Sequence, residues 1–156
     1  MKILTRRFRN KRLSNTLRRA TAFYLDCLHQ QTSNVTITII QMPNLGADGT
    51  CEKISKREFV IELNDDLTLE HSLITLAHEV VHIKQYLTKQ LRTWYLKTGI
   101  IDVWEGKRFR NVNYLQQPWE NEALQLEEHL YIDFVSECYA TGVELPNTAY
   151  NAGVCC

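Results

Sequence analysis

The sequence predicts an α+β fold: an N-terminal helix, a short antiparallel sheet and two further helices. Apolar residues recur at helical spacing in three separate stretches, and β-branched residues alternate with other residues between the first two. A chain of 156 residues that is 44% hydrophobic has the size and composition of one domain with its own core. We therefore expect a single domain over residues 1–156, with a basic arm at 1–20 and a tail of small residues at 147–156.

The first helix is expected from Leu13 onward, where Ser14 or Asn15 is a suitable N-terminal cap. Two strands follow. Val35, Ile37 and Ile39 alternate with threonines, and Phe59, Ile61 and Leu63 alternate with other residues. Turn-forming residues at 44–49 separate the two stretches, which predicts a hairpin, with room for an extra strand at 51–55.

The second helix is expected to begin after Thr68, a good capping residue, and its apolar stripe runs to Leu87. Residues 98–117 lack a clean period and predict a long connection anchored by Trp94 and Trp104. Pro118 is well placed to open a third helix, whose stripe includes Ala123, Leu126, Leu130 and Phe134.

The second helix carries the motif His78-Glu79-Val80-Val81-His82. Helical spacing puts the two imidazoles one turn apart on one face, where both can reach one metal ion, while Glu79 lies to the side. Two neutral imidazoles preserve the Lewis acidity of Zn²⁺, and a carboxylate beside them can take a proton from an activated water. The alternative is a purely structural histidine pair, which would need partners in this apolar helix.

A catalytic zinc site needs a third protein ligand. Residues 118–123 place Glu120 and Glu122 in the first turn of the third helix. Acids there also favour the helix dipole, so neither carboxylate needs a metal to explain it. The helical wheel places the two on opposite sides of the apolar stripe and leaves the choice between them open.

The motif, followed on a later helix by Asn121-Glu122-Ala123, resembles the gluzincin branch of zinc metallopeptidases. The wider pattern over residues 63–139 is similar to small phage-type metallopeptidases. The resemblance implies a minimal zincin-like domain that hydrolyses peptides or proteins. His78, His82 and Glu122 would bind Zn²⁺, with Glu120 as the alternative third ligand and Glu79 as the general base. The chain departs from the family in the long 40-residue spacing from His82 to Glu122.

Other histidines and tyrosines of the chain are weaker candidates for the site. His71 is two turns from His78, roughly 10 Å along the axis, which is too far to share an ion. Tyr114, His129 and Tyr131 are candidates for holding the oxyanion of a peptidase intermediate. Strand 59–63 resembles the edge strand on which such enzymes lay an extended peptide, although core packing explains its pattern equally well.

The N-terminal arm offers a second function class. Eight of the 18 Lys and Arg residues lie in the first 20 positions, which hold no acid. Such a cluster could bind nucleic-acid phosphates, leaving the zinc site structural or vestigial, or it could pack against the acidic remainder of the domain. An inert assembly component is a third class. The candidate nucleic-acid residues are Arg6, Arg7, Arg9, Lys11, Arg12, Arg18 and Arg19.

Composition also indicates a compartment. No apolar run approaches the roughly 20 residues of a membrane span, and no apolar stretch typical of a secretion signal follows Arg19. The five cysteines are an odd number without a CxxC pair, which favours free thiols in a reducing compartment. We expect a cytoplasmic protein, or one in the host cytoplasm if a phage encodes it, without membrane association.

Overall fold

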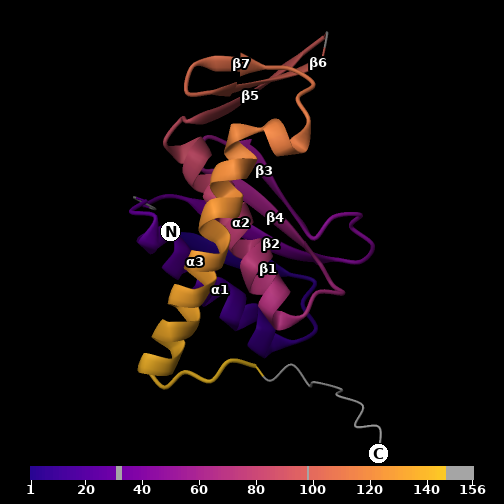
Figure 1. Cartoon of the computed structure of the whole chain (residues 1–156). Helices are drawn as coiled ribbons and strands as arrows, with labels where there is room; N and C mark the ends of the chain where they lie inside the picture. Colours follow the sequence, from indigo (N-terminus) through magenta and orange to yellow (C-terminus); the bar gives the residue numbers. More distant parts are fainter. Residues whose placement is uncertain (31–32, 98, 147–156) are drawn as a thin grey trace, which may run out of the picture.

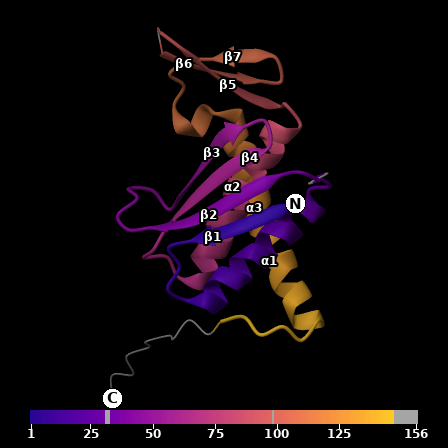
Figure 2. The same cartoon turned by 180° about the vertical axis from the view of Figure 1, so that it is seen from behind.

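A computed structural model describes residues 1–30, 33–97 and 99–146, and the tail expected at 147–156 lies outside these ranges. The expected α+β class is confirmed: helices cover one face of a sheet, and a second small sheet lies beyond one end of them (Figures 1 and 2). The elements, in chain order, are β1 (Lys2–Arg6), α1 (Lys11–Cys27), β2 (Thr36–Met42), β3 (Gly49–Ser55), β4 (Glu58–Asn64), α2 (Leu69–Leu87), β5 (Leu91–Leu96), β6 (Gly99–Trp104), β7 (Lys107–Phe109), the 3-10 helix η1 (Tyr114–Gln116) and α3 (Pro118–Ala140).

The larger sheet is mixed, with the strand order β1-β2-β4-β3. Strands β1, β2 and β4 are parallel, and only β3 runs antiparallel to its neighbour β4. The predicted antiparallel sheet is therefore wrong, and so is the predicted hairpin between the stretches that became β2 and β4. The chain between them forms a third strand, β3, which makes the hairpin with β4. Because β3 runs back along the sheet before β4 begins, β4 points in the same direction as β2.

The strand expected at the edge of the sheet lies inside it. β4 is paired on both sides, and its Phe59, Ile61 and Leu63 are buried against the helices. The two edges of this sheet are β1 and β3. Consequently β3, the strand that sequence patterning placed least firmly, is the one with a free edge beside the motif helix.

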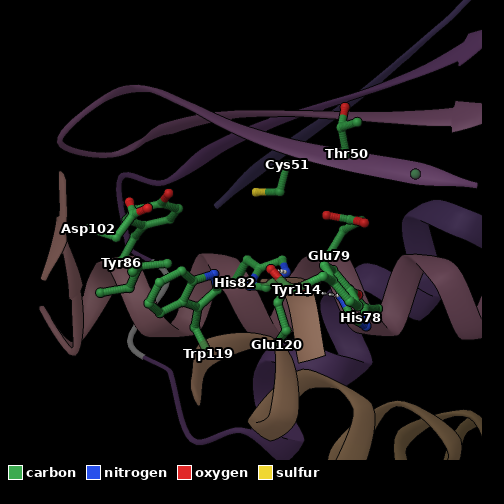
Figure 3. A pocket seen from close by; sticks show the side chains of 12 residues that line it. Thr50, Cys51, His78, Glu79, His82, Tyr86, Asp102, Tyr114, Trp119 and Glu120 are labelled. Carbon is green, nitrogen blue, oxygen red and sulfur yellow. Dashed lines mark hydrogen bonds and ion pairs between the residues drawn. The ribbon is translucent and has the colours of Figure 1, made fainter. Parts of the chain in front are cut away.

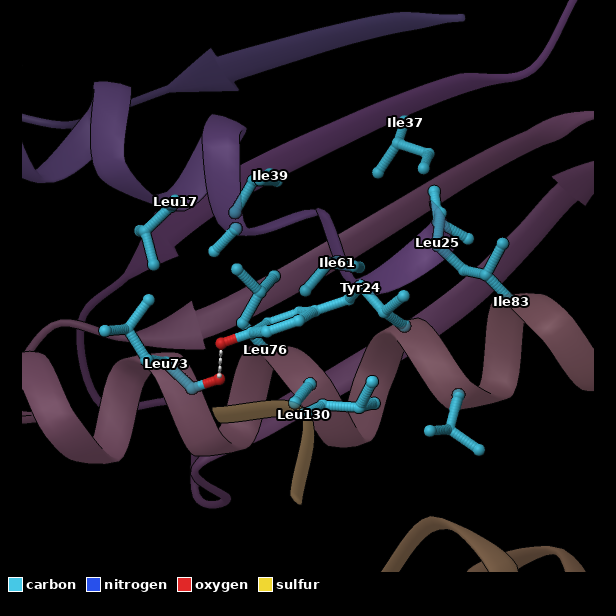
Figure 4. Packing of buried hydrophobic residues seen from close by; sticks show 14 of the residues in the cluster. Leu17, Tyr24, Leu25, Ile37, Ile39, Ile61, Leu73, Leu76, Ile83 and Leu130 are labelled. Atoms are coloured by element: carbon cyan, nitrogen blue, oxygen red, sulfur yellow. Dashed lines mark hydrogen bonds between the residues drawn. The ribbon is translucent and has the colours of Figure 1, made fainter. Parts of the chain in front are cut away.

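The core lies between the sheet and the helices (Figure 4). Tyr24 is fully buried there, and its hydroxyl donates a hydrogen bond to the carbonyl oxygen of Leu73 at 3.2 Å. Helix α1 begins earlier than expected, because Asn10 rather than Ser14 or Asn15 caps it and accepts from the backbone of Arg12 and Leu13. Phe134 of α3 packs against Tyr24, with ring centroids 5.8 Å apart, and so ties the third helix to the same core.

Helix α2 has the predicted start and end. Thr68 caps it by accepting from the backbone N–H of His71 at 3.2 Å. Helix α3 opens at Pro118, also as predicted. The two helices pack along their length, so residues from the first turns of α3 face the second half of α2 (Figure 1).

Residues 91–109 form a sheet of the order β5-β6-β7, where a connection was predicted over 98–117. Trp94, an expected anchor, is 39% exposed, and the ring that ties the sheet to the helices is Phe109, whose centroid lies 5.6 Å from that of Trp119. Cross-strand pairing stabilises these strands, and that pairing leaves little trace in any single segment. Within the described ranges, no helix combines the length and apolarity needed to cross a bilayer.

Candidate metal centre

Helix α2 places the motif where the larger sheet, the start of helix α3 and the β5-β6-β7 sheet meet. His78 and His82 are 8% exposed, and their ring centroids lie 4.9 Å apart, one helical turn along the axis. Neighbours Val80, Val81 and Ile83 are fully buried. The apolar stripe therefore fixes the rotation of the helix and holds both imidazoles in a semi-enclosed position.

Glu120, in the first turn of α3, faces both histidines (Figure 3). Its Oε2 lies 3.1 Å from Nε2 of His78, and its Oε1 lies 3.5 Å from Nε2 of His82. One donor atom from each of the three residues lies within 4.8 Å of the other two. Two imidazole nitrogens and a carboxylate oxygen at this spacing can hold one metal ion.

Glu122, the preferred third ligand from the sequence, lies elsewhere. Its carboxylate accepts from Nζ of Lys84 at 2.7 Å and from Nε2 of Gln85 at 2.9 Å. Residues two apart on a helix differ by about 200° in direction, so the two glutamates cannot share a face. Glu120, the alternative, is the carboxylate that the structure brings to the histidine pair.

The outer nitrogens of both imidazoles are held by other side chains. Nδ1 of His78 lies 2.7 Å from Oε2 of Glu127, and Nδ1 of His82 lies 2.9 Å from Oε1 of Gln85. Both oxygens only accept hydrogen bonds, so each Nδ1 carries the proton and donates. The lone pairs of both Nε2 atoms then point at the carboxylate of Glu120, an arrangement that calls for a cation or a further proton between them.

Sequence reasoning missed Glu127 and Gln85, although both left a signal. Glu127 follows Glu120 by seven residues, which is two helical turns on the same face of α3. Gln85 follows His82 by three residues, close enough for side chains on one helix to meet. The Gln85 amide is fully buried, and its Nε2 also donates to the carbonyl oxygen of Trp119 at 2.8 Å.

Glu79 lies on the side of α2 that faces β3 (Figure 3). It is 5% exposed, and β3 passes so close that a Cβ on Gly49 would lie 3.1 Å from its Oε1. Burial raises the pKa of the Glu79 carboxyl, an effect that the positive charges of His82 and His78 oppose. A buried carboxyl with a raised pKa beside a histidine pair has the environment of a general base.

The other acid-base groups of the site respond to one another in the metal-free protein. Burial lowers the pKa of His78, but the hydrogen bond to Glu120 and nearby carboxylates outweigh it and raise that pKa to about 9. The same competition between burial and Glu120 raises the pKa of His82. Burial would raise the pKa of Glu120, but its hydrogen bonds to His78 and His82 hold that pKa well below the usual range.

The site opens into a cavity of 240 Å³ between α2, β3 and the start of α3. Tyr114, one of the three oxyanion candidates, lines this cavity; burial and a hydrogen bond to Glu120 raise the pKa of its hydroxyl. His129 and Tyr131 do not line it. His71 lines a neighbouring hollow and lies outside the ligand cluster, as expected.

Comparisons with protein-family models, with curated proteins and with solved structures gave no match for this chain. The resemblance to gluzincins therefore rests on the motif residues alone and stays a prediction. What the chain itself supplies is the cluster of His78, His82 and Glu120, which can hold a metal ion.

Proposed function

We propose that this chain is a zinc-dependent peptidase with a minimal zincin-like fold. The observation that carries the proposal is the orientation of the two histidines. Glu127 and Gln85 fix both Nδ1 atoms as donors, so both Nε2 lone pairs converge with the Glu120 carboxylate on one point. Metal-binding histidines are held by outer partners in the same way.

Two imidazoles and one carboxylate suit Zn²⁺, and they leave one coordination position for water. When bound there, zinc would lower the pKa of water and polarise the carbonyl of a peptide bond. Glu79 would then take the proton from the attacking water and give it to the leaving amine. Burial raises the pKa of the Glu79 carboxyl, which makes it a stronger base toward the attacking water than an exposed carboxylate would be.

Tyr114 is the best-placed candidate for the oxyanion. It lines the same cavity as Glu79, and its hydroxyl is held by Glu120. The side chain is 49% exposed, so the phenol can turn toward a substrate carbonyl that enters from solvent. A hydroxyl donor at this position would stabilise the tetrahedral intermediate.

The test is peptide hydrolysis by the zinc-loaded full chain, followed by mass spectrometry on a mixed peptide pool. Glu79→Gln keeps the shape of the side chain and removes its base, so it should retain zinc and lose at least about a hundredfold in rate. Glu128→Gln, at an exposed position of α3, serves as the control and should keep the activity. Equal cleavage by Glu79→Gln and the unaltered protein would refute the mechanism.

We further propose that the enzyme works in the cytoplasm. Cys27, Cys51 and Cys138 are free thiols in the described part of the chain, while Cys155 and Cys156 lie outside it. Free thiols of this kind are typical of a reducing compartment.

A nucleic-acid-binding protein is the second candidate, and the exposure of the arm favours it. Its seven candidate residues, Arg6, Arg7, Arg9, Lys11, Arg12, Arg18 and Arg19, are all exposed. Within the described residues none of them forms an ion pair with a carboxylate, so the arm does not lean on the acidic remainder through salt bridges. Salt-dependent binding to DNA or RNA that disappears when these residues are neutralised would support this function. No binding at low salt would exclude it.

A further inference from the structure

A hollow of 510 Å³ opens beside the metal cavity, between strands β3 and β5. We call it the β3–β5 groove; its lining includes Lys53, Lys56, Tyr86, Arg92, Trp94 and Tyr95. Cys51 and Tyr86 line both this groove and the metal cavity. A chain that lies in the groove can therefore continue directly to the histidine cluster.

Both strands that flank the groove are edge strands. Within the described residues β3 ends the larger sheet and β5 ends the smaller one. Each therefore presents backbone N–H and C=O groups that no neighbouring strand pairs. An extended peptide is the ligand whose backbone complements such an edge, which favours a peptide over a nucleic acid as the occupant.

The charge of the groove is positive. Lys53, Lys56 and Arg92 are exposed, and no carboxylate of the described chain forms an ion pair with any of them. Lys53 Nζ instead lies 5.3 Å from the ring centroid of Tyr86, at the border with the metal cavity. Glu52 is the single acid in the lining, so positive charge is in excess.

The hollow on the other side of the metal cavity has no lysine or arginine in its lining. It measures 460 Å³, shares Gly49 and Glu79 with the metal cavity, and is lined by Asp48 and Glu127. The lysines and arginine of the cleft are therefore confined to the β5 side of the histidine cluster, whereas carboxylates lie on the other side. A peptide that spans the cleft would bind best with its acidic part on the β5 side.

We propose that the β3–β5 groove binds the acidic segment of an extended peptide and sets the sequence preference of the metal centre. The exposed rings of Trp94 and Tyr95 add an apolar surface for side chains that alternate with the acidic ones. The preference in cleavage rests on the proposed peptidase function, whereas the binding does not.

The test uses the full-length Glu79→Gln protein, which binds without cleaving, and a fluorescein-labelled peptide whose one half is rich in glutamate. Binding is measured by fluorescence anisotropy. The pair Lys53→Glu with Arg92→Glu should weaken binding by at least about tenfold. The same pair should bind a peptide with lysine in place of glutamate more tightly than the unaltered groove does.

The matched control is Lys2→Glu with Lys107→Glu, which changes the net charge equally at two exposed positions on β1 and β7, the strands at the opposite edges of the two sheets. Equal weakening by this pair would show binding to overall charge and overturn the proposal. A thymidine oligonucleotide that outcompetes the acidic peptide in the groove would overturn it as well.

Cleavage assays with the active protein separate the two proposals. Charge-dependent binding without cleavage of any peptide would support the proposed role of the β3–β5 groove and refute the proposed peptidase function. Equal cleavage of acidic and lysine-containing peptides would support the peptidase and refute the groove.

Discussion

Nδ1 of His82 donates a hydrogen bond to Oε1 of Gln85 at 2.9 Å. The amide cannot be flipped, because its Nε2 donates to the carbonyl oxygen of Trp119 and to Glu122. Gln85 thereby connects the first turn of α3 to the orientation of an imidazole on α2. Glu122, expected to bind the metal directly, would act on the metal site through this amide.

Replacement of Gln85 by leucine should weaken zinc binding by about ten- to a hundredfold, because His82 loses the partner that fixes its ring. Zinc affinity is measured by competition with a chromophoric chelator, and circular dichroism checks that the variant is folded. Gln90→Leu, in the turn after α2, is the control and should bind zinc normally. Unchanged affinity in Gln85→Leu would show that packing alone orients His82.

Glu120→Gln should abolish stoichiometric zinc binding, whereas Glu122→Gln should retain it with a modest loss of affinity. The two substitutions are chemically identical and lie two residues apart, but only Glu120 faces both Nε2 atoms. Elemental mass spectrometry of the purified protein measures the metal content. Loss of zinc in Glu122→Gln alone would show that Glu122, the third ligand implied by the resemblance to gluzincins, binds the metal instead of Glu120.

The parts of the site that the sequence predicts are those within one helix. Thr68 and the apolar stripe determine where α2 begins and which face it buries, so the relation of His78 to His82 follows from helical geometry. The choice between Glu120 and Glu122 depends on how α3 rotates against α2. Trp119 is buried at that contact and is part of the packing that sets the rotation. The sequence pattern of α3 alone does not contain this information about packing between helices.

The sheets show the same limit. The alternation in residues 58–64 predicts strand β4 and the buried side of its Phe59 and Ile61. The same alternation does not determine which strands pair with β4 on its two sides. Strands β5 to β7 were missed because their pairing with one another, rather than a buried face, stabilises much of their length. Strand order and the second sheet therefore depend on contacts between segments.

Zinc affinity should rise with pH up to about 9. The pKa of His78 is raised to about 9 in the metal-free protein, so its Nε2 is protonated below that pH and the ion must displace this proton. Displacing the proton of His78 should lower the affinity by up to about tenfold for each pH unit below this value, and His82, whose pKa is also raised, adds to the dependence. Glu120 adds no competition near neutrality, because its pKa is lowered.

Chelator competition between pH 6 and 8, corrected for the chelator's own protonation, measures this dependence. Glu127→Gln is the informative comparison, because Glu127 contributes to the raised pKa of His78. This variant should show a weaker dependence on pH above neutrality. A flat profile in the unaltered protein would mean that His78 is already neutral before the metal binds.

Gly49→Ala should destabilise the protein by roughly 1–3 kcal/mol through overpacking and should slow catalysis. The new Cβ would lie 2.6 Å from Cγ2 of Thr75 and 3.1 Å from Oε1 of Glu79, so the strand or the base must move. Thr75→Ser removes the nearest methyl group, and the double variant should recover part of the lost stability. Thermal unfolding measures the stability independently of activity, and zinc content should be unchanged, since none of the three ligands is touched. A stable Gly49→Ala protein with full activity would show that β3 has room to shift away from Glu79.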